Sequence, residues 1–415
     1  MGILGGALNR RDFNRSLLMG AVGLTFAEGA SAADSAPAKT ITLGVLSDFS
    51  NVFSTSGGKG LVVAAKLAAD DFLKANPDAN FNVDVIYADH QQKADVGAAV
   101  AKQWYEQRNV DAILDVVNSA VAFAVVEETR KHNKVALISG AGSAQLTGTL
   151  CTPNSIHWTY DTWEVGHVVG KTITERGGKS WFFITADYSF GKDLATSTAA
   201  AIKQAGGSVI GEVKHPIGSQ DFSSFLLQAQ SSGAQVVGFA NAGGDLVTSV
   251  KQAHEFGVTP TQQIAAINAN IVDIKSLGLE EAQGITLAEP FYWDLNDSTR
   301  DWTHRFEAAY STSYPTLHHA GIYAAVTHYL KAVNAVATSD GDKVVAQMKK
   351  IPTKDGLFSD GYVRQDGRVI HDVYVFKVRS PTESKSPWDL YQLIETIPGD
   401  KAFRPLADGA CPIVI

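Results

Sequence analysis

The segment TITLGVL at residues 40–46 gives the first indication of the fold class, because it is a short run of β-branched and apolar residues that suits a buried strand. The segment 57–73 follows after a polar loop and carries apolar residues at helical spacing. The same unit then repeats, with strands predicted at 82–87, 112–116 and 135–139 and helices at 95–107 and 120–131. Regular alternation of strand and helix predicts a parallel sheet covered by helices on both faces.

A second series of the same kind occupies the middle of the chain. Strands are predicted at 181–185, 207–213, 236–240 and 264–267, and helices at 191–205, at 222–231 and after Gly244. The pattern breaks at 154–161 and again at 289–293, which are candidate crossings between two domains. The helical pattern at 300–336 predicts helix packed back on the first domain, whereas the late strand at 373–378 could join either.

These breaks predict two Rossmann-like lobes and a tail. Lobe 1 comprises residues 40–160 and 290–365, lobe 2 comprises 161–289 and 366–400, and 401–415 form a C-terminal tail. A chain of 415 residues, 45% of them hydrophobic, is long enough for two cores. Several crossings between lobes would make a stiff hinge over a cleft.

The N-terminus carries the pattern of an export signal. Arg10, Arg11 and Arg15 precede the apolar run 17–24, and the small residues 30–32 offer a cleavage site. The adjacent arginines resemble a twin-arginine signal, and an ordinary secretion signal is the alternative. The apolar run is too short to span a bilayer. We therefore expect residues 1–33 to be a signal peptide and the mature chain to be periplasmic.

Charge and cysteine content narrow the partners and the chemistry. A net charge of −8 and a pI near 5.8 give no reason to expect nucleic acid as a partner. Cys151 and Cys411 are the only cysteines, and in an oxidising compartment they favour one disulfide that pins the tail. Two buried reduced cysteines remain the alternative, because spacing alone does not show proximity.

Motifs for catalysis are missing where they would be expected. The segment 57–60, GGKG, opens a helix but lacks the spacing of a phosphate-binding loop, and no dinucleotide fingerprint follows a strand. The adjacent His318 and His319 point about 100° apart on a helix, so they do not form a chelating pair. The segment 139–143, SGAGS, has no nucleophile-elbow frame. We expect no enzyme activity, no cofactor and no metal.

Small and polar residues recur directly after the predicted strands. In open parallel sheets ligands bind beyond the carboxyl ends of strands, so these loops are expected to face a cleft. The plainer interpretation is that surface loops are polar in any case. The loops are 48–50, Asn118-Ser119, 139–143, Asp187-Tyr188 and 241–245.

In this order the motifs resemble the branched-chain amino-acid type of ABC-transporter substrate-binding protein, of the type I periplasmic binding fold. The carriers of the resemblance are GVLS at 44–47 leading to SNVF at 50–53 and Gly57, YADHQ at 87–91, SGAGS at 139–143, DYSFG at 187–191 and DFSSF at 221–225. The resemblance implies two lobes joined by a three-stranded hinge, with ligand bound between them and closure recognised by a permease in the inner membrane.

The resemblance also implies roles for single residues. Backbone and hydroxyl groups matching Ser119, Ala141 and Ser143 would hold a ligand carboxylate, and Tyr188 would close over the ligand. Relatives that bind an α-ammonium group use an acidic residue in the region where this chain has Asn268-Ala269-Asn270. A neutral amide cannot supply that charge-assisted bond, which puts an amino-acid ligand in doubt. Three acidic residues could substitute for it, namely Asp161, Asp245 and Glu289.

The expected function is therefore solute binding for an ABC importer by a monomer, with a small polar or carboxylate-bearing ligand that is amino-acid-like or an aromatic or aliphatic acid. A periplasmic sensor that feeds a receptor is the alternative, and an exported α/β enzyme is a weaker one. Aromatic residues near the crossings could line the pocket or simply pack between lobes. The predicted ligand-binding residues are Phe53, Asn118, Ser119, Ala141, Gly142, Ser143, Tyr160, Asp161, Tyr188, Asn241, Asn268 and Glu289.

Overall fold

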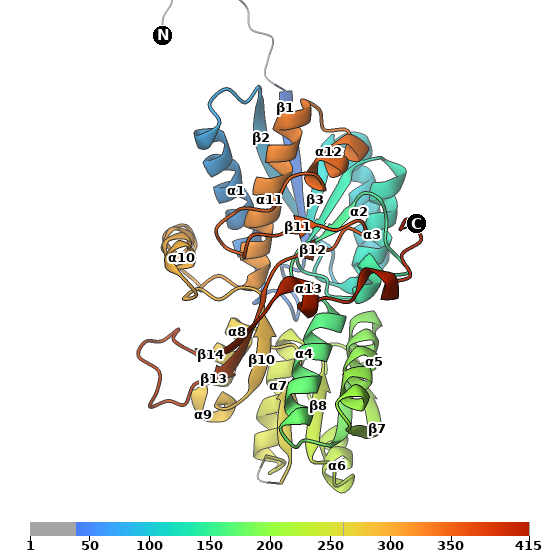
Figure 1. Cartoon of the computed structure of the whole chain (residues 1–415), viewed down its shortest axis with the longest axis vertical. Coiled ribbons are helices and arrows are strands. Elements are labelled where there is room, and N and C mark those ends of the chain that lie inside the picture. The colour runs from blue at the N-terminus through green and yellow to red at the C-terminus, as the bar shows by residue number, and fades with distance from the viewer. Residues whose placement is uncertain (1–38, 260, 415) are drawn as a thin grey trace, which may run out of the picture. The chain divides into compact units, whose positions relative to one another are not determined.

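Residues 39–259 and 261–414 are described by a computed structural model, shown in Figure 1. The signal peptide predicted at 1–33 lies outside these residues. Within the described part of the chain, no helix is both long and apolar enough to cross a bilayer.

The first sheet has five strands, and every neighbouring pair is parallel. Its strands and first helices are β1 (Lys39–Ser47), α1 (Gly58–Ala75), β2 (Phe81–Asp89), α2 (Ala94–Gln107), β3 (Val110–Asp115), α3 (Ser119–Lys131), β4 (Val135–Ile138) and β5 (Ser155–His157). The strand order is β2-β1-β3-β4-β5. Alternate residues of β1 point to opposite faces, so Leu43 and Val45 pack with α1 while Leu46 packs with α2 and α3. The predicted parallel sheet with helices on both faces is confirmed.

The helical pattern at 300–336 forms two helices rather than one. They are α10 (Asp297–Ala309) and α11 (Leu317–Val336), separated by a segment that contains Pro315. Helix α11 packs along α1, so the predicted return of this region to the first sheet is confirmed. A further helix, α12 (Gly341–Met348), packs on α11 and was not predicted.

The second sheet has four parallel strands in the order β7-β6-β8-β9. Its elements are α4 (Thr162–Glu175), β6 (Ser180–Ala186), α5 (Ser189–Gln204), β7 (Ser208–His215), α6 (Ser223–Ser231), β8 (Val236–Ala240), α7 (Gly243–Glu255) and β9 (Gln263–Ala266). Trp181 and Phe183 of β6 pack with α4 and α5, whereas Phe182 and Ile184 pack with α6 and α7. The predicted second α/β series is confirmed, although α4 was missed.

The first parallel sheet with its helices is called the first half of the protein, and the second parallel sheet with its helices is called the second half. An antiparallel sheet extends the second half. It contains β10 (Thr286–Glu289), β13 (Val373–Val378) and β14 (Tyr391–Ile397), in the order β10-β13-β14. Two short helices, α8 (Ile271–Leu277) and α9 (Leu279–Ala282), precede β10, and a two-stranded ladder of β11 (Tyr362–Val363) and β12 (Val369–Ile370) precedes β13. The late strand at 373–378, which lies in the segment predicted for lobe 2, thus pairs with β10.

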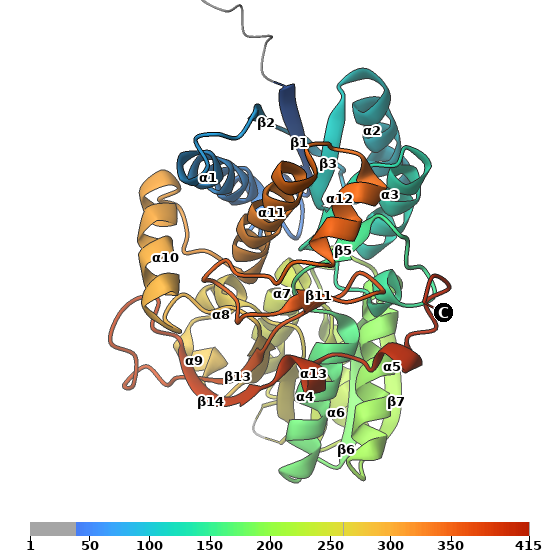
Figure 2. The ribbon, with the colours of Figure 1, turned by 45° about the horizontal axis from the view of Figure 1, so that its top comes forward.

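The C-terminal tail runs from the antiparallel sheet back to the first half of the chain, as Figure 2 shows for the red segment through α13 (Gly399–Ala402). It continues through η2 (Leu406–Asp408), and the guanidinium of Arg404 donates a 2.8 Å hydrogen bond to the carbonyl of Ala144 in η1 (Ala144–Thr147). A disulfide joins Cys151 to Cys411, with Cα atoms 5.7 Å apart. The predicted disulfide is confirmed, and the alternative of two reduced cysteines is wrong.

The two halves touch extensively, so residues from Lys39 onward form one compact unit. The division into two lobes at the predicted boundaries therefore stays a prediction, although each predicted lobe has its own parallel sheet.

Candidate functional site

A small cavity lies where loops of both parallel sheets meet. Its lining comes from segments that follow β1, β3, β5, β6, β8 and β9, together with the start of α11. These are carboxyl ends of parallel strands, the position at which open α/β sheets bind ligands. The lining residues are Phe53, Ser56, Val117, Tyr160, Tyr188, Phe190, Ala242, Gly243, Asn268, Asn270 and His318.

Aromatic rings form much of this lining. The ring centroids of Tyr160 and Phe190 are 6.5 Å apart in a T-shaped arrangement, and Tyr188 and Phe190 are 6.0 Å apart. Gly142 lies behind them, and a Cβ atom there would be 2.6 Å from the ring of Tyr160 and 2.8 Å from that of Phe190. The glycine is therefore what allows these two rings to meet at the cavity.

The polar side chains of the lining are uncharged at neutral pH. The hydroxyl of Tyr160 donates to the carbonyl of Gly140 at 3.1 Å, and burial raises its pKa above the usual value. Burial lowers the pKa of His318 to about 4, so its ring is neutral. Among the described residues that line the cavity there is no aspartate, glutamate, lysine or arginine.

Several helices begin at this cavity, among them α3, α5 and α7. Tyr188 is the N-cap of α5 and Ala242 is the N-cap of α7, while Val117 directly precedes Asn118, the N-cap of α3. Helix N-termini carry the positive end of the helix dipole, and no side chain caps the first amides of α5. The electrostatic bias of the cavity therefore favours a group with negative charge, although no cationic side chain lines it.

Contacts across the cavity hold the two halves together around it. The amide of Gly244 in α7 donates to the carbonyl of Val52 at 3.1 Å, and Nδ2 of Asn270 donates to the hydroxyl of Ser56 at 3.2 Å. Gly244 and Asn270 follow strands of the second sheet, whereas Val52 and Ser56 follow β1 of the first sheet. A ligand in this cavity would therefore touch both halves of the protein.

Four predicted ligand-binding residues line the cavity, namely Phe53, Tyr160, Tyr188 and Asn268. Gly142 packs against two of the lining rings from behind. The ligand-binding role of all of them stays a prediction, but the structure brings them together in one place.

The predicted residues of the loops after β3 and β4 lie outside the lining and bond to other protein groups. The side-chain oxygen of Asn118 accepts from the amide of Ala120 at 2.9 Å, which caps α3. The hydroxyl of Ser119 accepts from the amide of Ser143 at 3.2 Å, and Ala141 is fully buried. The hydroxyl of Ser143 donates to the carboxylate of Asp193 in α5 rather than pointing free into the cavity.

The remaining predicted residues also lie outside the lining. Asp161 caps α4 by accepting from the amide of Glu164 at 2.9 Å. Nδ2 of Asn241 donates to the hydroxyl of Ser249 at 3.2 Å. Glu289 is buried, with one carboxyl oxygen unpartnered, and burial raises its pKa well above the usual value. Asp245, the other candidate for an ammonium, has both oxygens 3.0 Å from the amide of Gly218.

Sequence reasoning missed the residues that distant segments bring to the cavity. Phe190 and His318 were not among the predicted site residues, and neither were Ser56 and Asn270. A signal existed for Ala242 and Gly243, because they belong to the polar loop at 241–245. No local pattern marks His318, which reaches the cavity only because α11 packs on α1.

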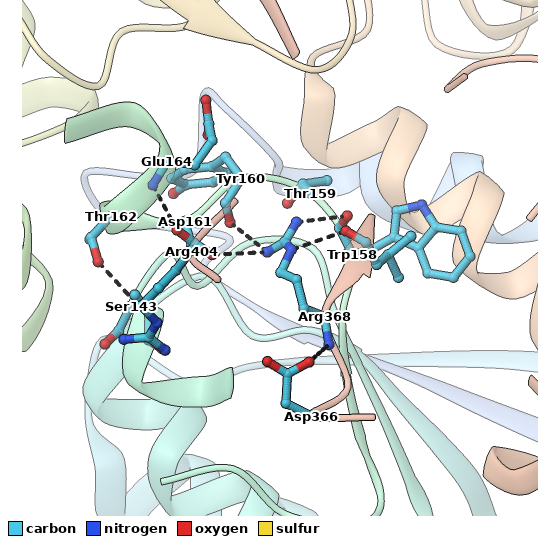
Figure 3. A network of polar contacts seen from close by, with 12 residues as sticks. Ser143, Trp158, Thr159, Tyr160, Asp161, Thr162, Glu164, Asp366, Arg368 and Arg404 are labelled. Carbon is cyan, nitrogen blue, oxygen red and sulfur yellow. Dashed lines mark hydrogen bonds and ion pairs between the residues drawn. The ribbon is translucent and has the colours of Figure 1, made fainter. Parts of the chain in front are cut away.

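A buried arginine supports the segment that carries Tyr160, as Figure 3 shows. The guanidinium of Arg368 donates to the carbonyls of Trp158 at 3.0 Å and Tyr160 at 3.3 Å, and lies 3.6 Å from the carboxylate of Asp161. Burial lowers its pKa to about 10, so it stays charged at neutral pH. Its own amide donates to the carboxylate of Asp366 at 3.1 Å. This residue ties the 158–161 crossing to the segment that precedes β13.

Comparisons with known proteins agree with this architecture. A family model described as periplasmic binding protein matches residues 40–385. A periplasmic binding protein from Burkholderia mallei is 42% identical, with a TM-score of 0.88 over 91% of this chain and 100% of that one. A protein of Burkholderia xenovorans named as a branched chain amino acid ABC transporter periplasmic ligand-binding protein is 36% identical, with a TM-score of 0.80 over 90% and 99%.

A curated relative, Leu/Ile/Val-binding protein homolog 6 from Brucella abortus, is 24% identical over 207 residues. That match covers 50% of this chain and 52% of the relative, so the chain spans about half the length of the curated relatives it matches. The family model, by contrast, runs through both parallel sheets and the antiparallel one as far as β13. The chain belongs to the periplasmic binding protein family.

Proposed function

We propose that this protein captures a small solute for an ABC importer in the cavity between its two parallel sheets. The observation that carries the proposal is that one cavity is enclosed by strand-end loops of both sheets. A ligand there contacts both halves and stabilises the arrangement in which they touch. That arrangement is then what the permease in the inner membrane recognises. A sensor feeding a receptor would use the same ligand step.

The ligand is a small carboxylic acid without an ammonium group. The free space inside the cavity is about 20 Å³, which is room for about one water molecule, so the ligand enters when the loops of the two sheets move apart. The helix N-termini favour a carboxylate. An ammonium group would be left without an anionic partner, because the polar lining is neutral. The xenovorans relative is named for branched-chain amino acids, and the neutral lining supports a different ligand here.

A thermal-shift screen tests this function with matched pairs of compounds. 4-Methylpentanoate is compared with leucine, and 3-phenylpropanoate with phenylalanine, because each pair differs only in the α-ammonium group. A ligand that binds only the folded state, present at a concentration of about 100 times its Kd, stabilises that state by about 2.7 kcal/mol. We expect a rise in Tm with at least one acid and not with its amino-acid partner. A rise with the amino acids alone would contradict the proposed ligand class.

The protein is proposed to release this ligand unchanged. The family and the fold are those of solute-binding proteins. Mass spectrometry of a bound acid after prolonged incubation should recover the starting compound quantitatively. Addition of the loaded protein to its permease and ATPase in proteoliposomes should stimulate ATP hydrolysis, whereas a sensor would leave the rate unchanged.

The proposed location is the periplasm, reached as a monomer after removal of residues 1–33. A fusion of these residues to a reporter that is active only after folded export tests the twin-arginine route. If the reporter stays in the cytoplasm of a strain that lacks the twin-arginine route, that route is supported. If the same strain exports the reporter normally, the general secretion route is supported. Light scattering of the mature protein tests the monomer.

A further inference from the structure

One cavity residue, His318, has a ring whose hydrogen-bonding state is determined by its surroundings. It is the second residue of α11, and its ring stands T-shaped against that of Tyr160 at 5.9 Å between centroids. Only 5% of its surface is exposed, and its ring lines the cavity. Nδ1 lies 3.1 Å from the carbonyl oxygen of Ser139.

That contact assigns the proton. A carbonyl oxygen can only accept a hydrogen bond, so Nδ1 of His318 must carry the hydrogen. The buried ring is neutral at pH 7 and has one ring hydrogen, so Nε2 carries a lone pair and acts as an acceptor.

Nε2 of His318 has no hydrogen-bond partner in the part of the chain that the structure describes. It also remains accessible, whereas the unpartnered Nε2 of His90 and Nδ1 of His328 are sealed inside the protein. An accessible acceptor on a cavity wall is available to whatever occupies the cavity.

The neighbouring His319 shows what a structural histidine looks like in the same helix. Its Nδ1 accepts from the amide of Thr316 at 3.0 Å, and its Nε2 donates to the carbonyl of Gly57 at 2.8 Å. Both nitrogens are used within the protein, and the ring is in the opposite tautomer to that of His318. The two adjacent residues therefore differ in role although both are buried.

We propose that Nε2 of His318 determines specificity, by accepting a hydrogen bond from a hydroxyl group of the ligand. The inference rests on the proposed function and narrows its ligand to a hydroxylated carboxylic acid. The helix N-termini receive the carboxylate, the rings of Tyr160, Tyr188 and Phe190 pack against the body, and the hydroxyl meets His318. A ligand without a hydroxyl leaves this acceptor unpaired and binds roughly tenfold to a hundredfold more weakly.

Calorimetric titration with matched compounds tests this role. The series compares 4-hydroxybenzoate, benzoate and 4-methoxybenzoate, and in parallel 2-hydroxy-4-methylpentanoate, 4-methylpentanoate and the 2-methoxy acid. The methoxy group fills similar space but has no hydrogen to donate. We expect the hydroxy acid of at least one series to bind at least tenfold more tightly than both of its analogues. Equal binding of hydroxy and methoxy acids would overturn the inference.

Variants assign this preference to the histidine. In His318→Asn the shorter amide can still donate to Ser139, but no acceptor reaches the position of Nε2, so the preference should disappear. His318→Gln retains an acceptor further out and should recover part of it. His328→Asn is the matched control, because His328 is equally buried in α11 and bonds to the carbonyl of Met348. An equal loss of preference in His328→Asn would also contradict the inference.

A ligand-free measurement separates failure of this inference from failure of the proposed function. Long-range nitrogen–proton NMR correlations report which ring nitrogen carries the hydrogen. We expect the Nδ1–H tautomer for His318 and the Nε2–H tautomer for His319. An Nε2–H tautomer at His318 overturns the inference whatever binds. If no acid in the series binds, the proposed ligand class is wrong and the inference that rests on it falls too.

Discussion

Gly142 and Arg368 show how single residues shape the cavity without lining it. Gly142 leaves room for the rings of Tyr160 and Phe190 to meet. Arg368 uses a buried guanidinium to hold the carbonyls of Trp158 and Tyr160 in place. Neither residue touches the cavity, and each nevertheless sets the position of Tyr160.

Replacing Gly142 by alanine should reduce ligand affinity. The new Cβ would overlap the rings of Tyr160 and Phe190 and push them into the cavity, and overpacking of this kind costs about 1–3 kcal/mol of folding stability. Urea unfolding and calorimetric titration measure both effects. Gly244→Ala is the control, because the nearest atom to its Cβ would be 3.7 Å away. Unchanged affinity in Gly142→Ala would contradict the assigned role.

Replacing Arg368 by methionine should destabilise the protein by about 3–5 kcal/mol, because Asp161 then keeps a buried charge without its partner. Ligand affinity should fall as well, since the segment that carries Tyr160 loses two hydrogen bonds. Arg130→Met is the control, as this exposed arginine only pairs with Glu127 on α3. Equal unfolding midpoints for the two variants would show that the buried network contributes nothing.

Helices and loops from the two halves meet directly beside the cavity. The clearest contact joins η1 to α5, where Ser143 donates its hydroxyl to Asp193 and Nε2 of Gln145 lies 3.5 Å from the same carboxylate. A charge-assisted bond of this kind forms only when the halves are in contact. It therefore adds to the closed arrangement without touching a ligand.

Asp193→Ala should accelerate ligand release, by roughly tenfold if the lost bond contributes about 1.5 kcal/mol. The association rate should change less, because the contact forms after the ligand enters. Stopped-flow fluorescence measures both rates. Asp187→Ala is the control, because Asp187 pairs only with Lys192 at an exposed site next to the same helix. A dissociation rate equal to that of the wild type would exclude a role for Asp193 in closure.

The end of β10 carries a carboxyl group that makes folding pH-dependent. Burial, together with the nearby carboxyl of Asp273, raises the pKa of Glu289 well above its usual value. The folded protein therefore keeps this proton at pH values where the unfolded chain has lost it. The resulting stabilisation is complete below about pH 4 and is lost as the pH rises towards the folded-state pKa.

Glu289→Gln should remove this pH dependence. The unfolding free energy of the wild type relative to the variant should fall with rising pH, by up to about 1.4 kcal/mol per pH unit. Urea unfolding at about pH 5, 6.5 and 8 measures the difference. Glu395→Gln, at an exposed position of β14, is the control. If the unfolding free energy of the wild type rose with pH relative to that of Glu289→Gln, the raised pKa would be contradicted.

The whole chain is closed on itself by the disulfide between Cys151 and Cys411. The two cysteines are 260 residues apart, so the bond constrains a large part of the unfolded chain. It fastens the C-terminal tail, in which Phe403 packs against the ring of His371 and Arg404 bonds to η1. The guanidinium of Arg368 lies over the ring of Phe403 in this tail, with its Cζ atom 4.1 Å from the ring centroid.

Removal of the disulfide should destabilise the fold and preserve the cavity. Cys151→Ser with Cys411→Ser should lower the unfolding free energy by about 2–5 kcal/mol. Ligand affinity should change little, because neither cysteine lines the cavity. A reductant should lower the Tm of the wild type and leave that of the double variant unchanged. A double variant as stable as the wild type would show that the tail is held by its other contacts alone.

Local periodicity was enough to predict the fold class, since the strand at 40–46 and the strands and helices after it have periodicities that report burial on one or two faces. The sequence also indicated the disulfide and the loops that follow the strands. It missed α4 and joined α10 to α11, because a local pattern does not show how neighbouring apolar segments divide between cores.

The identity of the residues that form the cavity follows from the packing of distant segments. Tyr188 was predicted because it follows a strand of a parallel sheet, and Asn268 because it lies in the region where relatives carry an acidic residue. Ser143, from an equally suitable loop, turned out to bond to Asp193, and His318 and Arg368 carry no motif. These side chains find their partners on segments between 50 and 210 residues away, and local sequence does not encode how such segments approach one another.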